Sequence, residues 1–305
     1  MKSITYSQYL TVKKSIDDRS INPNVWSCLA DSLPEKTDSH PLRVLEIGCG
    51  IGTMVERCIE RGLLEHAVYE AVDRDSQLIE CAIKRLNSLP DSHILQVERN
   101  SSYKITHASL EVSGLMVNLI VAEALEFTHH QIDHNLWDLI IAHAFLDLVN
   151  LDIIPALLNL VGPGGLFYFT HNFDGLTAFL PVIDPVFDQQ VVHLYQRSMD
   201  ERQIDGTFTG GSQTGRKLLS RVVAEGAHII QAGASDWLVA PGETGYTDDE
   251  AVFLHAILQT VANELKDHPQ LNALKFADWI DQRQKQIDSA ELIFLAHQID
   301  VIGKR

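Results

Sequence analysis

The sequence predicts an α/β protein with a doubly wound, mostly parallel sheet. An apolar run from Leu42 to Ile47 ends abruptly in glycines at positions 48, 50 and 52. Strand-like and helix-like patterns then alternate through residue 170. A glycine-rich turn at residues 162–165 leads into a further apolar run. This alternation is typical of parallel strands joined by helical crossovers.

Composition excludes several classes of protein and partner. The chain has 305 residues, of which 45% are hydrophobic, and 24 Lys and Arg residues against 41 Asp and Glu residues give a net charge of −17. Such a surface repels phosphate backbones, so nucleic acid is not expected as a partner. No apolar run is long enough to span a bilayer, and the four cysteines fit no disulfide or zinc framework. We therefore expect a cytoplasmic protein with reduced cysteines and no membrane partner.

The first part of the chain is predicted to form a cap followed by a βαβ unit. Residues 1–40 are expected to be an N-terminal helical cap, with one or two helices between residues 4 and 32. A helix is expected from Thr53 to Arg61, a strand from Val68 to Val72, and a further helix with Ser76 as its N-cap.

The middle of the chain continues the sheet. The segment from Ile94 to Phe127 is predicted to be β-rich, with a hairpin turn at residues 113–114. Trp137 to Ala142 is the next expected strand, followed by helical structure through Leu160.

The alternation breaks at residues 174–212, which contain prolines and a glycine-rich stretch. We interpret this segment as a lid or substrate insertion over the carboxyl edge of the sheet. Residues 213–305 are predicted to return to the same domain. They are expected to form helices over 213–225, 247–265 and 273–286, with strands over 228–238 and 290–302.

The glycine segment is the most informative motif. Glycines after a strand let the backbone turn sharply and let a ligand lie where a Cβ would collide. The third position of a dinucleotide motif falls on Thr53, which disfavours a nicotinamide cofactor. The run Val44-Leu45-Glu46-Ile47-Gly48-Cys49-Gly50-Ile51-Gly52 closely resembles motif I of the class I S-adenosylmethionine-dependent methyltransferases of small molecules.

Further segments continue this resemblance in order along residues 42–172. Asp73 matches the family's ribose-binding acid, about 20 residues past the glycines. Residues 122–127, 137–143 and 161–166 resemble the adenine-binding segment, motif IV and the turn before the fifth strand. The resemblance implies a seven-stranded Rossmann-like sheet whose residues 41–173 form the cofactor-binding half.

The resemblance also implies S-adenosylmethionine as the cofactor. Glu46 is expected at its amino group or the surrounding waters, Asp73 at the ribose hydroxyls, and Glu123 at the adenine amino group, where Asp is commoner. The full set of expected cofactor-binding residues is Glu46, Gly48, Cys49, Gly50, Gly52, Asp73, Arg74, Glu123, Ala124 and His143.

Methyl transfer requires a nucleophile in line with the methyl group and, for a hydroxyl or amine, a general base. The ends of the fourth and fifth strands face that point. His143, Asp147 and His171 are the candidate catalytic residues, with His143 the leading candidate for the base. The alternative for His143 is a histidine packed at a strand end. Motif IV lacks Asn-Pro-Pro-Tyr and Asp-Pro-Pro-Tyr, which favours a small-molecule acceptor over nucleic acid.

The expected acceptor-binding residues are Arg19, Phe145, Asn172, His193, Tyr195 and Arg197. Polar tips alternate from His193 to Met199 as in a β-like segment, where Arg197 could clamp a carboxylate or phosphate. A surface arginine is the alternative. His130 and His134 have a metal-ligand spacing, but they fall in a predicted loop without a completing ligand, so no metal is expected.

The sequence therefore predicts S-adenosylmethionine-dependent methyl transfer to a small molecule. A related protein that binds the cofactor without turnover is the first alternative, and a nicotinamide-dependent oxidoreductase is the second. The sequence leaves a homodimer open and does not identify the acceptor.

Overall fold

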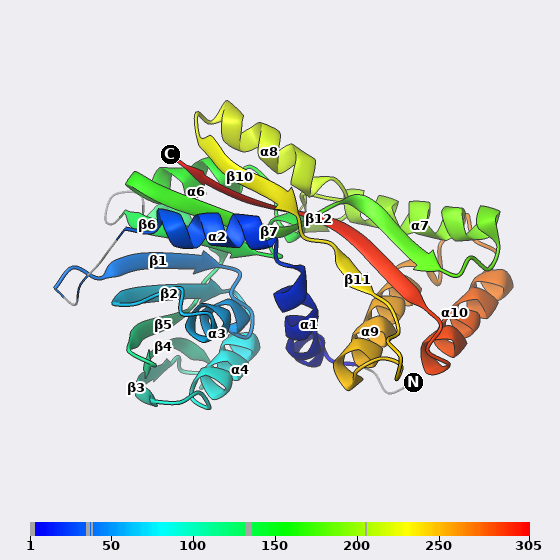
Figure 1. Cartoon of the computed structure of the whole chain (residues 1–305), viewed down its shortest axis with the longest axis horizontal. Coiled ribbons are helices and arrows are strands. Elements are labelled where there is room, and N and C mark those ends of the chain that lie inside the picture. The colour runs from blue at the N-terminus through cyan, green and yellow to red at the C-terminus, as the bar shows by residue number, and fades with distance from the viewer. Residues whose placement is uncertain (1–3, 35–36, 38, 132–135, 205) are drawn as a thin grey trace.

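A computed structural model describes residues 4–34, 37, 39–131, 136–204 and 206–305 (Figure 1). Its helices are α1 (Tyr6–Ser20), α2 (Pro23–Ser32), α3 (Thr53–Glu60), α4 (Ser76–Leu86), α5 (Ala124–Gln131), the 3-10 turn η1 (Leu146–Leu148), α6 (Ile153–Leu160), α7 (Pro185–Asp200), α8 (Thr214–Ala224), α9 (Asp248–Leu265) and α10 (Ala273–Asp288). Its strands are β1 (Leu42–Ile47), β2 (Ala67–Asp73), β3 (Ser92–Arg99), β4 (Ile105–Val112), β5 (Leu115–Val121), β6 (Trp137–His143), β7 (Val161–Leu180), β8 (Gln203–Ile204), β9 (Thr207–Phe208), β10 (His228–Ala234), β11 (Trp237–Val239) and β12 (Ile293–Lys304).

The main sheet has the order β10-β12-β7-β6-β1-β2-β5-β4-β3. Strands β5, β2, β1, β6 and β7 run parallel, and β12 runs antiparallel to both β7 and β10. The order reverses between β1 and β6, which makes this point the topological switch where α/β sheets bind ligands. The seven strands from β5 to β10 confirm the predicted Rossmann-like methyltransferase fold. The hairpin of β3 and β4 extends the sheet beyond β5.

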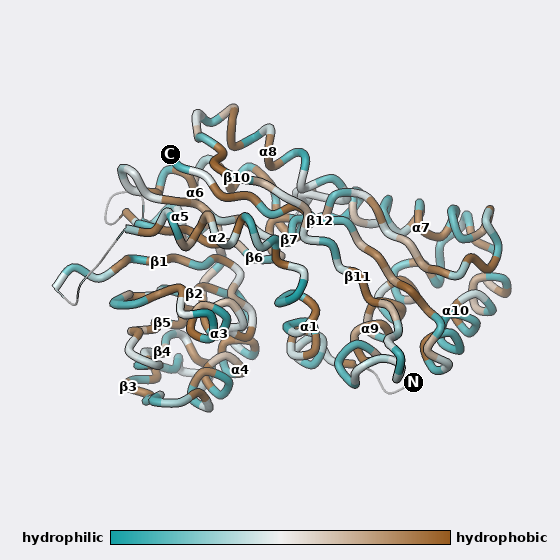
Figure 2. Tube along the Cα trace, viewed as in Figure 1, coloured by the Kyte–Doolittle hydropathy of each residue, from teal (hydrophilic) through white to brown (hydrophobic). Residues whose placement is uncertain are grey.

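Helices cover both faces of this sheet because its strands are apolar on both sides. Side chains of α2, α3 and α4 pack on one face, for example Leu29, Met54 and Ile79. Side chains of α6 and α8, including Leu157 and Leu218, pack on the other. In Figure 2 the central strands are largely hydrophobic, whereas α7 and α10 alternate between hydrophobic and hydrophilic residues.

A second lobe extends from one end of the sheet. β7 continues for 20 residues, and its distal half pairs with β12, which also pairs with β11. Helices α7, α9 and α10 pack around these strands, and α1 lies between the two lobes (Figure 1). The lobe has its own core of aromatic and aliphatic side chains, including Phe253 and Trp279. Residues 174–180 therefore continue a strand, where the sequence predicted the start of an insertion.

Some predicted local structures are wrong. The segment from His193 to Met199 is helical, within α7, because its apolar positions Val191, Leu194 and Tyr195 follow helical spacing. β5 ends at Val121, and the predicted loop after it is helix α5.

Two boundaries also differ from the prediction. Asp75 replaces Ser76 as the N-cap of α4, because its carboxylate accepts the amide of Gln77. The strand predicted over 228–238 divides into β10 and β11. Among the described residues, no helix combines the length and apolar character that a membrane crossing requires.

Candidate functional site

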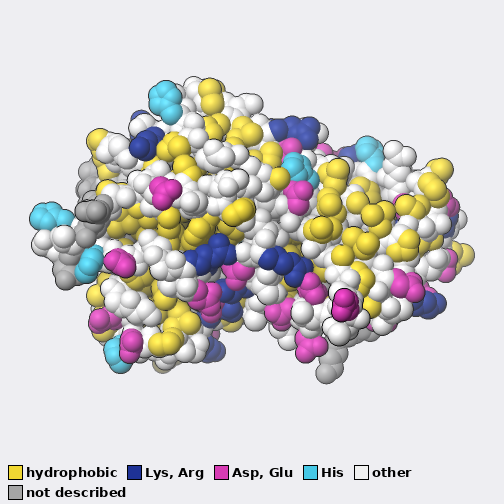
Figure 3. Space-filling model, viewed as in Figure 1, with side chains coloured by type: hydrophobic (Ala, Val, Ile, Leu, Met, Phe, Trp, Pro, Cys, Tyr) yellow, Lys and Arg dark blue, Asp and Glu magenta, His cyan; other side chains and the backbone are white. Residues whose placement is uncertain are grey.

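A cavity of about 1150 Å³ opens at the carboxyl ends of β1, β2, β6 and β7 and continues between α1 and the second lobe. Most residues predicted for the cofactor line it: Glu46, Gly48, Cys49, Gly50, Asp73, Arg74, Glu123, Ala124 and His143. In the view of Figure 3, charged side chains of both signs gather where α1 lies beside α3, and hydrophobic side chains gather over β11 and β12. The cavity wall itself combines polar side chains, such as Asp17 and Asp73, with apolar ones, such as Phe173 and Phe294.

The glycine turn forms the wall under β1. Gly48 and Gly50 have φ values of 74° and 54°, a region that side chains with a Cβ rarely adopt. A Cβ on Gly48 would lie 2.2 Å from Cδ2 of Phe145, so the phenyl ring packs directly on the turn. Gly52 is the left-handed N-cap of α3 and does not line the cavity; its role in the structure is the turn and close packing on α4.

Asp73 connects the glycine turn to the end of β2. Its Oδ2 accepts the amide of Gly50 at 2.9 Å, and its Oδ1 accepts the amide of Asp75 at 2.9 Å. Burial raises the pKa of Asp73, although these two amides favour the charged form. Glu123 caps α5 by accepting the amides of Leu125 and Glu126, and its side chain is exposed at the cavity rim.

Glu46 lies deeper, at the end of β1. The residue is 1% exposed, and its Oε2 accepts a hydrogen bond of 2.8 Å from the hydroxyl of Tyr69. Burial raises the pKa of Glu46 to about 7, while the Tyr69 hydrogen bond and the charge of Arg57 oppose the rise. Cys49, next along the cavity wall, is also buried, and burial raises the pKa of its thiol.

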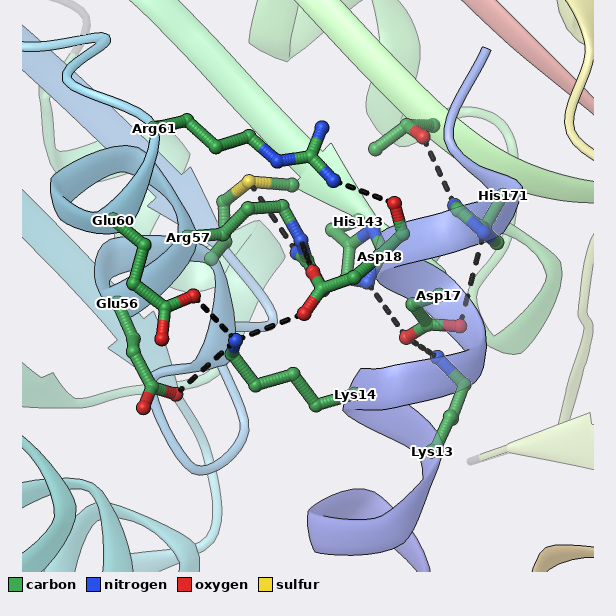
Figure 4. A network of polar contacts seen from close by, with 12 residues as sticks. Lys13, Lys14, Asp17, Asp18, Glu56, Arg57, Glu60, Arg61, His143 and His171 are labelled. Carbon is green, nitrogen blue, oxygen red and sulfur yellow. Dashed lines mark hydrogen bonds and ion pairs between the residues drawn. The ribbon is translucent and has the colours of Figure 1, made fainter. Parts of the chain in front are cut away.

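His143 forms part of a polar cluster that sequence reasoning missed. Its Nε2 lies 3.0 Å from Oδ2 of Asp17 on α1. Asp17 also accepts hydrogen bonds from Nζ of Lys13 and, at 2.9 Å, from Nε1 of Trp237 (Figure 4 shows the Lys13 contact). Because a carboxylate only accepts, Nε2 of His143 carries the proton. Its Nδ1 is buried and has no hydrogen-bond partner within the described residues.

The second candidate histidine, His171, lies beside this cluster. Its ring centroid is 4.9 Å from that of His143, and its Nε2 is 3.7 Å from Oδ1 of Asp17. Burial lowers the pKa of His143 to about 4 and of His171 to about 3, despite the neighbouring carboxylates. Burial alone would raise the pKa of Asp17, but Lys13 and the two histidines lower it well below the usual value. Both rings are therefore neutral beside an ionised carboxylate at neutral pH.

A second buried carboxylate fixes the backbone in the middle of β7, where the strand passes from the main sheet toward the second lobe. Oδ1 of Asp300 accepts the hydroxyl of Thr170 at 2.6 Å and the amide of His171 at 2.7 Å. Its Oδ2 accepts the amide of Asn22 in the corner between α1 and α2. The two carboxylates Asp17 and Asp300 thus join the N-terminal cap to the strands that carry the histidines.

An ionic cluster joins α1 to α3 beside the glycine turn (Figure 4). Nζ of Lys14 lies 2.9 Å from Asp18 and 2.6 Å from Glu60. The fully buried Arg57 of α3 forms an ion pair with Asp18. These contacts hold α1 against the cofactor half of the cavity.

The predicted acceptor residues divide into two groups. Phe145 and Tyr195 line the cavity, as do the candidate catalytic residues Asp147 and His171. The others do not line it, and their contacts are as follows. Arg19 pairs with Glu250, Arg197 pairs with Glu201 on the outer side of α7, His193 is exposed, and Asn172 donates to the carbonyl of Ile299.

The histidines considered for a metal lie on or after α5. His129 and His130 are exposed, and His134 is outside the described residues. In the part of the chain that the structure describes, no group of three His, Cys, Asp or Glu side chains is arranged to hold a metal ion.

No family model and no curated protein matches the sequence. Solved structures with a similar course of the chain include an S-adenosylmethionine-dependent methyltransferase of Thiobacillus denitrificans in complex with S-adenosyl-L-homocysteine (14% identity, 95% of this chain and 97% of that chain, TM-score 0.42). A phosphoethanolamine N-methyltransferase of Haemonchus contortus, in complex with phosphomonomethylethanolamine and S-adenosylhomocysteine, is 12% identical (100% and 59%, TM-score 0.43). A cyclopropane synthase of Mycobacterium tuberculosis is 10% identical (100% and 100%, TM-score 0.42). These similarities concern the fold.

Proposed function

We propose that this protein transfers a methyl group from S-adenosylmethionine to a small-molecule acceptor. The observation that carries the proposal is the arrangement at the switch point of the sheet. There the left-handed glycine turn, the Asp73 carboxylate bonded to the Gly50 amide, and the buried Glu46 carboxylate all border one cavity. When bound, the cofactor supplies an activated methyl group on a sulfonium.

The residues present fit this cofactor. The positive φ values of Gly48 and Gly50 turn the chain sharply after β1, so that the backbone of this turn lines the cavity. Each Asp73 oxygen keeps an acceptor site after binding one amide, which suits ribose hydroxyls. Glu46 has one neutral hydrogen-bond donor and no ion pair among the described residues, which suits a ligand that brings positive charge.

His143 is our candidate for the general base, with Asp17 as its positioning residue. The Asp17 contact keeps the proton on Nε2, so Nδ1 retains the lone pair that can accept a proton. Because burial lowers the pKa of His143 to about 4, the ring is in this accepting form at neutral pH. Asp147 and His171 line the same cavity and complete the set of candidates.

Calorimetry with S-adenosylhomocysteine tests cofactor binding directly. We expect the wild-type protein to bind it and Asp73→Ala to weaken binding by about 1.5–3 kcal/mol, the range for charge-assisted hydrogen bonds. Asp281→Ala, at an exposed ion pair on α10, is the matched control and should bind as the wild type does. No binding by a folded wild-type protein would overturn the proposal. Binding of NADH in its place would favour an oxidoreductase.

Turnover is tested separately with labelled S-adenosylmethionine and a metabolite extract. Transfer of label to a small molecule supports the enzyme, whereas cofactor binding without transfer favours a binding protein. His143→Gln should reduce transfer by about 100-fold or more, and its S-adenosylhomocysteine affinity, measured by the same calorimetry, separates loss of the base from loss of a cofactor contact. Unchanged transfer would assign His143 a purely structural role.

A further inference from the structure

The part of the cavity farther from the glycine turn has its own character. We call it the acceptor chamber; it is lined by Tyr9, Phe173, Tyr195, Met199, Ile257 and Phe294. These side chains come from α1, β7, α7, α9 and β12, so the chamber lies between the cap and the second lobe. Tyr195, Ile257 and Phe294 are buried, and most of the chamber surface is aromatic or aliphatic. An apolar ligand of ring size fits such a surface.

Three polar groups border this chamber without a partner. Within the described residues, the hydroxyls of Tyr9 and Tyr195 and the guanidinium of Arg202 form no hydrogen bond or ion pair through their side chains. All three can donate a hydrogen bond, and a guanidinium cannot accept one. Burial raises the pKa of Tyr195 to about 12, with the Arg202 charge opposing the rise, so this phenol stays protonated at neutral pH. All three groups can therefore donate a hydrogen bond to an acceptor atom of a ligand.

Arg202 is the distinctive member of this set. It is partly buried between α7 and β8. Burial raises the pKa of both Asp147 and Tyr195, and the positive charge of Arg202 opposes the rise in each. No ion pair joins it to Asp147. The other cations on the cavity wall differ from it, because Lys13 is paired with Asp17 and Arg74 is exposed. Among the described residues no carboxylate lies within ion-pair distance of Arg202, and a partly desolvated guanidinium is stabilised when a ligand supplies such a direct partner.

We propose that the methyl acceptor has an apolar, ring-sized body that occupies the acceptor chamber and one oxyanion group, a carboxylate or phosphate, that binds Arg202 and Tyr195. This inference rests on the proposed function, because it names the acceptor class of that same site. Arg202 is thereby a specificity-determining residue. Arg197, which the sequence analysis considered for such a clamp with a surface arginine as the alternative, lies on α7, is exposed and is paired with Glu201.

Fluorescent probes test the chamber without the cofactor. The anionic dye 8-anilinonaphthalene-1-sulfonate and the neutral dye N-phenyl-1-naphthylamine have similar ring systems and differ in the oxyanion. We expect one site for each on the wild-type protein. Arg202→Gln should weaken the anionic dye by about tenfold or more and leave the neutral dye within about twofold. Tyr195→Phe should weaken the anionic dye by about threefold.

Arg197→Gln is the matched control and should bind both dyes as the wild type does. Competition by 1-naphthoate and 1-naphthyl phosphate distinguishes a carboxylate from a phosphate, with 1-naphthalenemethanol as the neutral comparison. Equal binding of the anionic dye to the wild type and Arg202→Gln overturns the inference, and so does a wild type that binds neither dye. Because no cofactor is present, this outcome is separable from the S-adenosylhomocysteine titration. Failure of that titration would overturn the proposed function and the role of the chamber's ligand as a methyl acceptor, but it would leave the dye result unchanged.

Discussion

Two buried carboxylates border the same cavity, yet their surroundings move their pKa values in opposite directions. Asp17 on α1 is bonded to Lys13, His143 and Trp237, and its pKa lies well below the usual value. Glu46 on β1 is bonded to the Tyr69 hydroxyl, and burial raises its pKa to about 7. Burial alone disfavours the charged form of both groups, so the difference comes from the charges and donors around each.

This difference separates a structural carboxylate from one suited to a ligand. The protein itself neutralises Asp17, with an ammonium and two further donors from three separate elements. Glu46 has one neutral donor, and the Arg57 charge that acts on it is paired with Asp18. We infer that Asp17 holds the cap and orients His143. Glu46, whose raised pKa leaves the carboxyl only partly ionised near neutral pH, is suited to a cationic ligand that would stabilise its charged form.

The largest expected effect is the loss of the Asp17 carboxylate. Asp17→Ala leaves Lys13 buried without a counter-charge and removes the acceptor of His143 and Trp237. We expect the free energy of unfolding to fall by about 3–5 kcal/mol, as measured by urea denaturation at pH 7. Asp281→Ala breaks an exposed pair of the same i,i+4 spacing and should cost less than about 1 kcal/mol. Similar losses in the free energy of unfolding of the two variants would contradict the structural role inferred for the buried Asp17 carboxylate.

Glu46 should behave in the opposite way when the pH is raised. Its folded-state pKa of about 7 is above the usual 4.5, so its contribution to stability falls as the pH rises through this window. Glu46→Gln removes the titration. Relative to the wild type, this variant should gain up to about 3 kcal/mol in the free energy of unfolding between pH 4 and pH 8. The exposed Glu243→Gln is the control, and an equal pH dependence in both would refute the assignment.

The two histidines provide a pH dependence of the other sign. Their folded-state pKa values of about 4 and about 3 are below 6.5, so the unfolded chain binds more protons as the pH falls from 6.5. Each should therefore reduce stability by up to about 1.4 kcal/mol per pH unit between pH 6.5 and 4. His171→Gln should flatten the measured curve by that slope, whereas the exposed His93→Gln should leave it unchanged. A His171→Gln curve parallel to the wild type would show that the folded ring titrates normally.

The sequence indicates where the glycine turn, Glu46 and Asp73 lie, because the signals for their positions are local. A strand, a turn and an acid at the next strand end are each readable within a few residues. Asp17 could not be found in this way, because it meets His143 across 126 positions of the chain. Within α1, Lys13 and Asp17 have the spacing of an ordinary exposed pair, and burial distinguishes them only after α1 packs between the lobes.

The acceptor side was predicted less well for a related reason. Polar residues at every second position from His193 to Met199 fit a strand, and the helical spacing of Leu194 and Tyr195 was the competing signal. In the helix, Tyr195 lines the cavity and Arg197 lies outside it. Arg202, just after the helix, lines the cavity.

The smallest expected effect concerns the single donor to Glu46. Tyr69→Phe removes the 2.8 Å hydrogen bond to Glu46 while keeping the buried ring. The variant therefore measures how much this hydrogen bond favours the ionised carboxylate. A hydrogen bond contributes about 1 kcal/mol net, so its loss should raise the pKa of Glu46 from about 7 by less than about one pH unit. Carboxyl chemical shifts followed by NMR through a pH titration measure it. Without the Tyr69 hydroxyl, burial acts on the Glu46 carboxyl with less opposition, so the pKa should rise. A downward shift would mean that Tyr69 does not stabilise the charged form of Glu46. The explanation of the difference between Glu46 and Asp17 by their hydrogen-bond donors would then be wrong.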